Sequence, residues 1–353
     1  MRFFLILSLF VAPQAGAAEV YDFFDGVRSL GMGGSYTAVV NDETSLLTNP
    51  AGLAKLRDVM VVVANPEVQG SQNDTQIANL SNASVQEPSD LLNLLNQNKG
   101  LHWNAKAQVF PAIVAPDIGF GLLGKYQYDA SVNTAGTDFR YDYTNDFAAV
   151  FGFSLRFFGG ILKIGVDSRY VNRIEMHKDF NPTVTAIDMN QNASEGGGLA
   201  ADVGMIVTVP VALLPSIAVV VRDAGTTNYG LSSGMFLQTQ TRPADTPQTV
   251  DAGFSLSPIL SNHTRMTITG DYHDALNAWE QQGTLVHVHG GVEFNFSDFF
   301  FLRGGVNQGY WTAGFEIATR RFQLQAASYG EEIGTAASPQ EDRRYVGEIA
   351  FRF

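Results

Sequence analysis

Two stretches of the sequence carry residue types that could perform chemistry. The first is a glycine-rich segment, RSLGMGGSYTAVVNDETSLLTNPAGLA over residues 28–54, with Gly31, Gly33 and Gly34 close together. Glycine-rich loops bind phosphate when Gly-x-Gly-x-x-Gly follows a strand and opens a helix, or when a P-loop ends in Lys-Ser or Lys-Thr. Neither spacing is present, and the preceding YDFFDGVRS has no buried-strand pattern. The segment therefore does not predict a nucleotide site.

The second stretch places His287, His289 and Glu293 on one face of a strand-like run. Imidazole and carboxylate groups are zinc ligands, but alternate residues of a strand lie about 7 Å apart, and the sequence offers no third ligand. Asp271 and His273 form a similar pair, without a Ser or Cys nucleophile placed by any motif. We therefore predict no metal, no cofactor and no enzymatic activity.

The chain starts like an exported protein. Arg2 precedes an apolar run over residues 3–11, which is too short to cross a bilayer as a helix. The small residues Ala15-Gly16-Ala17-Ala18 follow, a pattern that signal peptidase recognises. We predict a cleaved signal peptide over residues 1–18; the alternative is an N-terminal membrane anchor.

Composition narrows the class of protein. The formal net charge is -13 and the isoelectric point about 4.8, which argues against nucleic acid as a partner. The chain has no cysteine, so disulfides and thiolate chemistry are excluded. An exported chain rich in glycine and aromatic residues, without apolar helices, indicates a soluble β protein or an outer-membrane barrel.

Strand patterning dominates the chain after residue 100. Leu162, Ile164 and Val166, for example, alternate with Lys163 and Asp167, as in a strand with one apolar and one polar face. About fourteen segments pass this test, near residues 57–65, 102–114, 117–130, 142–157, 161–174, 197–209, 216–223, 248–257, 264–273, 285–296, 299–307, 310–319, 321–329 and 344–353.

The connections between these segments alternate in length. Odd-numbered connections are mostly long, as at 66–101, 175–196 and 224–247, whereas even-numbered connections are brief. Long loops on one side and short turns on the other are typical of bacterial outer-membrane barrels, and a soluble sandwich has no reason to keep this order. We therefore predict an all-β fold: a transmembrane antiparallel β-barrel of about fourteen strands in the outer membrane of a Gram-negative bacterium.

The last strand supports this prediction. RRYVGEIAFRF places Tyr345, Gly347, Ile349, Phe351 and Phe353 on one face and ends on an aromatic residue. It resembles the C-terminal signal by which the outer-membrane assembly machinery recognises its clients. We expect this machinery and outer-membrane lipid as partners; an ordinary final strand of a soluble protein is the alternative.

If the apolar faces meet lipid, the opposite faces form a charged lumen. The inward set then comprises Lys125, Arg156, Lys163, Asp167, Arg169, Asp202, Asp251, Asp271, His287, Glu293, Arg303, Glu316 and Glu348. These charges have both signs, unlike the filter of a selective channel. Because unpaired charges would be costly there, we interpret them first as a network that braces the wall.

The glycine-rich segment lies between the predicted signal peptide and the first strand. In a barrel whose chain starts on the periplasmic side, such a segment can fold into the lumen, where small residues pack closely against the wall. The motif residues are Gly31, Gly33, Gly34, Asn49, Pro50, Ala51 and Gly52. This R-x-L-G-M-G-G-x-x-x-A-V segment closed by N-P-A-G resembles the FadL-type outer-membrane proteins, a superfamily that includes PorV-like and TraF-like barrels.

The resemblance covers about residues 27–56 and implies a hatch, a segment that closes the bore, over residues 19–56, followed by a barrel over 57–353. It implies passive uptake of long-chain fatty acids or other hydrophobic molecules, released sideways through a gap made by a kink in the third strand. Here the third strand, residues 118–128, has glycines but no proline. Two alternatives stay open: an accessory barrel that binds protein partners, and a general porin.

Overall fold

The computed structural model describes residues 22–73, 92, 95–184, 187–280, 283–335 and 338–353. Seventeen strand segments form a single sheet in which every pairing is antiparallel. Within these residues, no helix has the length and the apolar character needed to span a membrane.

The sheet closes on itself because the last segment pairs with the first two. The segments are β1 (Met60–Ala64), β2 (Glu67–Ser71), β3 (His102–Val109), β4 (Ala112–Ala115), β5 (Ile118–Val132), β6 (Phe139–Phe157), β7 (Leu162–Phe180), β8 (Ser194–Thr208), β9 (Ser216–Arg222), β10 (Thr249–Leu256), β11 (Ile259–Ser261), β12 (Thr264–Tyr272), β13 (Val288–Phe296), β14 (Phe300–Asn307), β15 (Tyr310–Ala318), β16 (Phe322–Glu332) and β17 (Glu341–Arg352). Three pairs of segments, β1–β2, β3–β4 and β10–β11, are single strands with an interruption, so the barrel has fourteen strands. The predicted fold is confirmed.

The alternation seen in the sequence separates the two faces of the wall. Along β6, Phe151, Phe153 and Leu155 point outward and are about half exposed, whereas Val150 and Ser154 point inward and are fully buried. The outer face is therefore a continuous apolar surface suited to lipid. The inner face must satisfy its polar groups within the protein.

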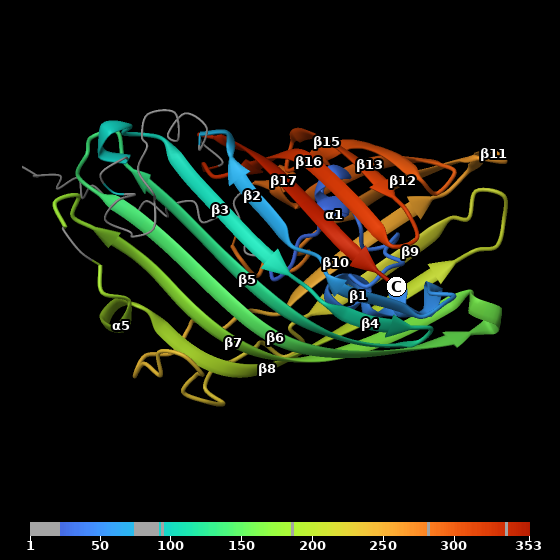
Figure 1. The fold of residues 1–353 in the computed structure, drawn as a ribbon, viewed down its shortest axis with the longest axis horizontal. Coiled ribbons are helices and arrows are strands. Elements are labelled where there is room, and N and C mark those ends of the chain that lie inside the picture. Colours follow the sequence, from blue (N-terminus) through green and yellow to red (C-terminus); the bar gives the residue numbers. More distant parts are fainter. Residues whose placement is uncertain (1–21, 74–91, 93–94, 185–186, 281–282, 336–337) are drawn as a thin grey trace, which may run out of the picture.

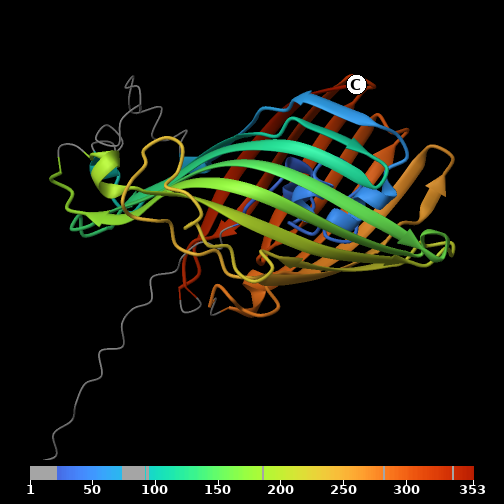
Figure 2. The same ribbon diagram turned by 90° about the horizontal axis from the view of Figure 1, so that it is seen from below.

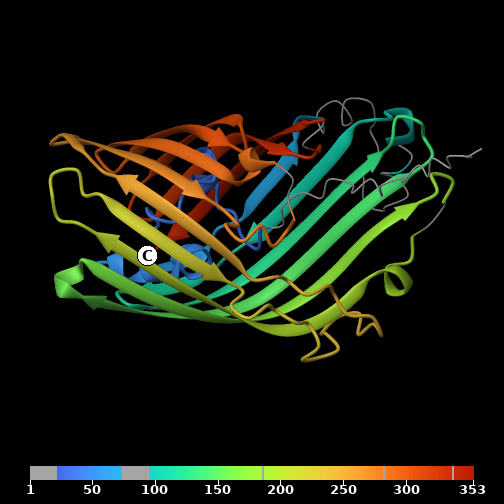
Figure 3. The same cartoon turned by 180° about the vertical axis from the view of Figure 1, so that it is seen from behind.

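The connections confirm the predicted order of long loops and short turns. Residues 116–117, 262–263 and 297–299 turn the chain at one end, whereas residues 72–101, 223–248 and 273–287 connect strands at the other. Strands β5 to β8 are longer than predicted: β6 and β7 each have 19 residues, against 8 in β14. They carry one side of the wall far beyond the rest of the barrel (Figure 1, Figure 3).

The wall is interrupted where two prolines face each other. Asn65 and Pro66 separate β1 from β2, and Phe110 and Pro111 separate β3 from β4. Proline cannot donate to the hydrogen-bond ladder, so the register shifts at this point. The Phe110 N–H donates instead to the Asn65 side-chain oxygen at 2.6 Å, and both side chains are buried.

The described N-terminal residues form three short helices inside the ring of strands (Figure 2). These are α1 (Val27–Gly31), α2 (Ser45–Thr48) and the 3-10 helix η1 (Pro50–Lys55). Short helices also occur in connections: η2 (Phe158–Gly160), α5 (Met189–Asn192) and η3 (Thr284–His287). The N-terminal helices contact strands of both halves of the wall, η1 on β6, β7 and β8 and α1 on β14, β15 and β16.

The outward apolar face predicts a depth-dependent cost for charge. Phe151→Arg, in the middle of β6, should lower the free energy of unfolding in phospholipid vesicles by about 2–4 kcal/mol, because the guanidinium enters the hydrocarbon region. Phe158→Arg, in the short turn after β6, is the matched control and should cost about 0–1 kcal/mol. Equal effects in urea-unfolding titrations would contradict this assignment of the lipid-facing surface.

Candidate functional site

The Asn-Pro-Ala-Gly motif forms a buried turn within the N-terminal segment. The Asn49 side-chain oxygen accepts a hydrogen bond from the Ala51 N–H at 3.1 Å and caps η1, which starts at Pro50. The Asn49 amide nitrogen donates to the carbonyl oxygen of Thr37, also at 3.1 Å. Asn49 is fully buried, so the motif ties two turns of the segment together.

Two wall glycines form the seat of this motif. Gly165 of β7 and Gly204 of β8 are paired neighbours and point inward. A Cβ at Gly165 would overlap the backbone of Pro50 and Ala51, and one at Gly204 would overlap the Asn49 side-chain oxygen. Any larger residue at these positions would therefore push the motif off the wall.

The glycines at the start of the segment lie against the opposite side of the barrel. Gly33 has a positive φ of 69°, and a Cβ there would overlap carbonyl oxygens of β13 and β14. Its carbonyl oxygen accepts a hydrogen bond from the His289 ring at 2.9 Å, and the Gly31 carbonyl accepts one from the Thr312 hydroxyl at 3.1 Å. Gly34 also has a positive φ, of 80°. The segment thus spans the lumen from β8 to β15.

An alternating chain of charges fixes α1 to the wall. Both nitrogens of the Arg28 fork donate to the Glu293 carboxylate, at 2.9 and 3.0 Å. Glu293 also accepts from Arg303 at 2.7 Å, and Arg303 forms an ion pair with Glu316. Of these four residues, Glu293, Arg303 and Glu316 were expected in the lumen network and lie together, whereas Arg28 was not expected there.

Other inward carboxylates also hold the segment. Asp271 accepts the backbone N–H groups of Tyr36 and Thr37, both at 2.8 Å. Asp251 accepts from the Arg222 guanidinium at 2.6 Å, and the same guanidinium donates to the Leu47 carbonyl oxygen at 3.1 Å. These predicted lumen residues therefore contact the segment directly or through one arginine.

A separate cluster surrounds Arg169. Its guanidinium donates to Asp202 at 2.5 Å and to Asp223 at 2.8 Å, and lies 3.5 Å from Asp167. The ring of Phe23, in the N-terminal segment, stacks on this guanidinium with 4.7 Å between the ring centroid and the Arg169 carbon. The predicted residues Asp167, Arg169 and Asp202 are thus brought together, buried, and covered by the segment.

The remaining expected lumen residues lie elsewhere. The Lys125 ammonium donates to the Asp22 carbonyl oxygen at 2.7 Å, at the start of the described segment. Lys163 and Arg156 lie near the short turns: Lys163 donates to the Gly160 carbonyl oxygen, and Arg156 pairs with Asp117 at 2.9 Å. His287 and Glu348 are buried; His287 contacts the His273 carbonyl oxygen and Glu348 accepts from Gln325.

Histidines gather at the long-loop end of this network. The His273 ring stacks on His289 with 4.0 Å between ring centroids. Burial alone would lower the pKa of His273, but the charges of Asp251 and Asp271 outweigh it and raise the pKa to about 9. No group of three His, Cys, Asp or Glu side chains suited to a metal occurs in the described part of the chain.

One side of the lumen is apolar. Phe24, Leu46, Leu47 and Leu53 of the segment pack against inward side chains of the wall. The wall members of this cluster are Phe110, Ala112, Val114, Leu123, Ala148, Val150 and Val171. The Phe24 and Phe110 rings lie 5.9 Å apart between centroids. An apolar strip thus runs along β4 to β7 and reaches the interrupted part of the wall.

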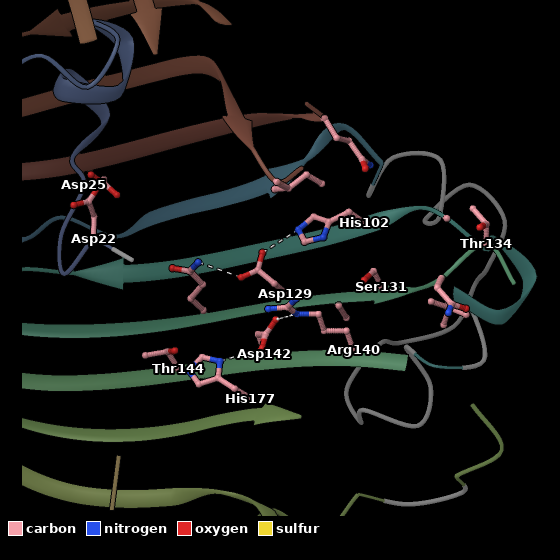
Figure 4. A pocket seen from close by; sticks show the side chains of 17 residues that line it. Asp22, Asp25, His102, Asp129, Ser131, Thr134, Arg140, Asp142, Thr144 and His177 are labelled. Carbon is pink, nitrogen blue, oxygen red and sulfur yellow. Dashed lines mark hydrogen bonds and ion pairs between the residues drawn. The ribbon is translucent and has the colours of Figure 1, made fainter. Parts of the chain in front are cut away.

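A cavity of about 380 Å³ opens between the start of the segment and the tall strands (Figure 4). Asp22 and Asp25 line one end, and ion-paired side chains of the wall line the other. Asp129 pairs with His102 at 3.2 Å. Asp142 pairs with Arg140 at 2.7 Å. Most of the lining residues are therefore polar, unlike those of the apolar strip.

The residues of the expected assembly signal point outward. Tyr345, Ile349, Phe351 and Phe353 are 42–65% exposed. They lie on β17 and at the C-terminus, on the outer face of the strand that closes the barrel. Their recognition by assembly machinery stays a prediction.

No protein-family model and no curated protein matches this sequence. Solved structures match its fold over nearly the whole chain. The toluene transporter TbuX of Ralstonia pickettii has a TM-score of 0.55 at 10% identity, covering 93% of this chain and 98% of that chain. The fold is that of a FadL-type barrel.

Two further solved structures share this fold. The CymD monoaromatic hydrocarbon channel has a TM-score of 0.54 at 10% identity, covering 96% of this chain and 97% of that chain. The deltaS2S3 mutant of the TodX monoaromatic hydrocarbon channel has a TM-score of 0.51 at 10% identity, with 93% and 98% covered. At this identity the likeness establishes the fold of the chain.

Sequence reasoning missed several residues of the site. Arg28 and Arg222 join the segment to the wall, yet Arg28 lies outside the strands and Arg222 ends one. The seat at Gly165 and Gly204 was also missed. A signal was present, because glycine at an inward position of a strand leaves room for a close backbone. The apolar strip was hidden, because its members are scattered over four strands.

The glycine seat predicts that a single methyl group displaces the motif. Gly204→Ala should release the N-terminal segment from β8 and raise the ion conductance of the barrel in planar bilayers, because the Cβ overlaps the Asn49 side chain. Gly304→Ala is the matched control, since a Cβ there meets its nearest atom at an ordinary 3.7 Å. Heat-modifiable migration in electrophoresis checks that both variants form barrels. Equal conductance would contradict the seat.

The charge chain predicts coupling between segment and wall. Arg28→Gln and Glu293→Gln should each destabilise the protein, because each removes one of the ion pairs of a buried charge: Glu293 keeps Arg303, and Arg28 keeps Asp42. The double variant should lose less than the sum, with a coupling energy of about 0.5–3 kcal/mol in urea-unfolding titrations. Strict additivity of the two effects would show that the pair does not hold α1 in place.

Proposed function

We propose that this barrel takes up small hydrophobic molecules passively across the outer membrane of a Gram-negative bacterium, with long-chain fatty acids among its substrates. The named structures of similar fold are transporters or channels for toluene and monoaromatic hydrocarbons. That likeness supports transport over catalysis. That long-chain fatty acids are among the substrates is proposed from the resemblance of residues 27–56 to FadL-type proteins.

The observation that carries the proposal is the apolar strip on the inner wall. Phe110, Val114, Leu123, Val150 and Val171 are almost completely buried against the N-terminal segment. Polar side chains at these inward positions would suit a water-filled pore better. A hydrophobic substrate can exchange contacts with the strip at little desolvation cost once the segment shifts.

The strip ends at the break in the wall, which gives a substrate a sideways route into the lipid. The third strand of the chain, β5, pairs with β6 without a shift in register over its whole length. The break lies instead between the first two strands, at Asn65–Pro66 and Phe110–Pro111. We infer that lateral release occurs there rather than through the third strand.

In this proposal the N-terminal segment acts as the hatch, over residues 19–56, and residues 57–353 form the barrel. Its contacts with β8, β13 and β15 hold it across the bore. The preceding residues 1–18 are the predicted signal peptide and lie outside the described residues. A closed bore argues against a general porin.

A second function is favoured by the polar side of the lumen. The Arg28–Glu293 ion pair braces the segment against the wall, and ion pairs at Arg169 and Arg303 join neighbouring wall strands. Most residues that line the 380 Å³ cavity are polar. These features suit an accessory barrel of the PorV-like or TraF-like kind, which binds protein partners through its loops. Uptake measurements separate the two functions.

The proposal predicts loss of uptake in a deletion strain and in a single variant. Phe110→Asp should abolish uptake of radiolabelled toluene and long-chain fatty acid in the complemented strain, because a carboxylate in the strip raises the cost of every apolar contact. Phe110→Leu is the matched control and should retain uptake. Heat-modifiable migration in electrophoresis confirms equal amounts of folded barrel.

Three uptake results would each change the proposal in a different way. If the deletion strain takes up both compounds at the wild-type rate, the transport function is wrong and the accessory function gains support. If toluene uptake falls while fatty acid uptake does not, the substrate class is narrower than proposed. Equal uptake by Phe110→Asp and Phe110→Leu would place the route away from the strip.

A further inference from the structure

The loop over residues 223–248, between β9 and β10, covers a free strand edge. Strand β9 pairs with β8 only from Val203 to Thr208, so among the described strands the upper part of β8 has a partner on its β7 side alone. The loop takes this place. The Gly197 N–H donates to the Ser232 carbonyl oxygen at 3.2 Å, and the Leu231 N–H donates to the Gly197 carbonyl oxygen at 2.9 Å.

A buried carboxylate on the outer face of the wall fixes the loop. Glu195 of β8 is 0% exposed, and the backbone N–H groups of residues 235, 236, 237 and 238 all donate to it, at 2.6–2.8 Å. Asn172 donates a further hydrogen bond at 2.9 Å. Charge-assisted bonds of this kind are strong, so the loop has a defined shape.

This fixed shape presents apolar side chains outward. Leu231 is 62% exposed, Met235 47% and Phe236 62%. Glu195 holds the backbone at Met235 and Phe236, and the Gly197 carbonyl oxygen holds it at Leu231. Three exposed apolar side chains within six residues of an ordered loop indicate a contact surface.

The height of the loop identifies what it contacts. Outward residues of β8 include Met205, Val203 and Leu199, and Leu199 is 61% exposed. From Val207 to Gly197 a tilted strand rises roughly 25 Å, which is about the height of the apolar band of an outer-membrane barrel. Leu231, bonded to Gly197, therefore lies at the outer rim of the lipid-facing band. The loop projects sideways from the wall at this point (Figure 1, Figure 3).

We propose that the loop is a membrane-contacting wedge in which Leu231, Met235 and Phe236 enter the acyl chains of the outer leaflet. Leu231 is hydrogen-bonded to Gly197, two residues from the exposed Leu199 on β8, and this closeness to the lipid-facing surface favours lipid over a protein partner. Side chains of this kind enter the boundary between head groups and acyl chains when their backbone lies in the interfacial plane. The Glu195 carboxylate sets that orientation from the protein side.

Nitroxide accessibility tests the wedge in the full-length barrel reconstituted in phosphatidylcholine vesicles. The chain has no cysteine, so Leu231→Cys and Phe236→Cys give unique labelling sites. Leu199→Cys is the lipid-facing reference, and Ala135→Cys, at the tip of the β5–β6 connection, is the aqueous reference. Labels at 231 and 236 should collide with oxygen and avoid a nickel chelate, as at 199.

Substitution of the Glu195 carboxylate gives a second measurement. Glu195→Gln should lower the oxygen-to-nickel collision ratio at position 236, because it weakens the bonds that orient the loop. Glu332→Gln, which caps the loop before β17 through the N–H groups of Gly334 and Gln340, should leave that ratio unchanged.

Two outcomes would overturn the wedge. A nickel collision rate at 231 and 236 equal to that at 135 places the patch in water. Protection from both oxygen and nickel places it against protein, either a partner or a second copy of the chain.

Discussion

Closure of the sheet is the constraint from which the other features of this molecule follow. In a bilayer an unpaired strand edge leaves backbone groups without hydrogen bonds, at a cost of several kcal/mol each. Pairing of β17 with β1 and β2 removes both edges. A closed ring of fourteen strands then encloses an interior that must be filled or left to water. The N-terminal segment occupies that interior.

The N-terminal segment that fills the lumen determines which side chains the inner wall presents. Where the segment presents backbone, the wall presents glycines or hydrogen-bonding groups, as at Gly165 and Asp271. Where it presents leucine and phenylalanine, the wall is apolar. The lumen therefore has two sides of different character, one held by ion pairs and one by packing. A substrate that avoids water is compatible with the second side, and rigid attachment of the segment with the first.

The sequence predicted the fold well because strand alternation and loop length are local properties. It also placed Glu293, Arg303 and Glu316 on one face, since neighbouring strands in register bring their inward residues together. It could not identify Arg28 as their partner, because that contact joins residues 265 positions apart. The lengths of β5 to β8 were underestimated, because residues such as Tyr141 and Ile174 continue the pattern above the lipid, where other loops cover them.

The two prolines in the wall have a mechanical consequence. Pro66 and Pro111 offer carbonyl oxygens to their outer neighbours, Ile349 and Leu122, and neither has an N–H to offer across the gap. The bond that spans the gap there comes from the Asn65 side chain. Unlike a ladder of backbone bonds, a side chain can let go by rotating about its own torsions, without disturbing the strands on either side. The interruption between the first two strands is thus closed by a hydrogen bond that a single side-chain rotation can break.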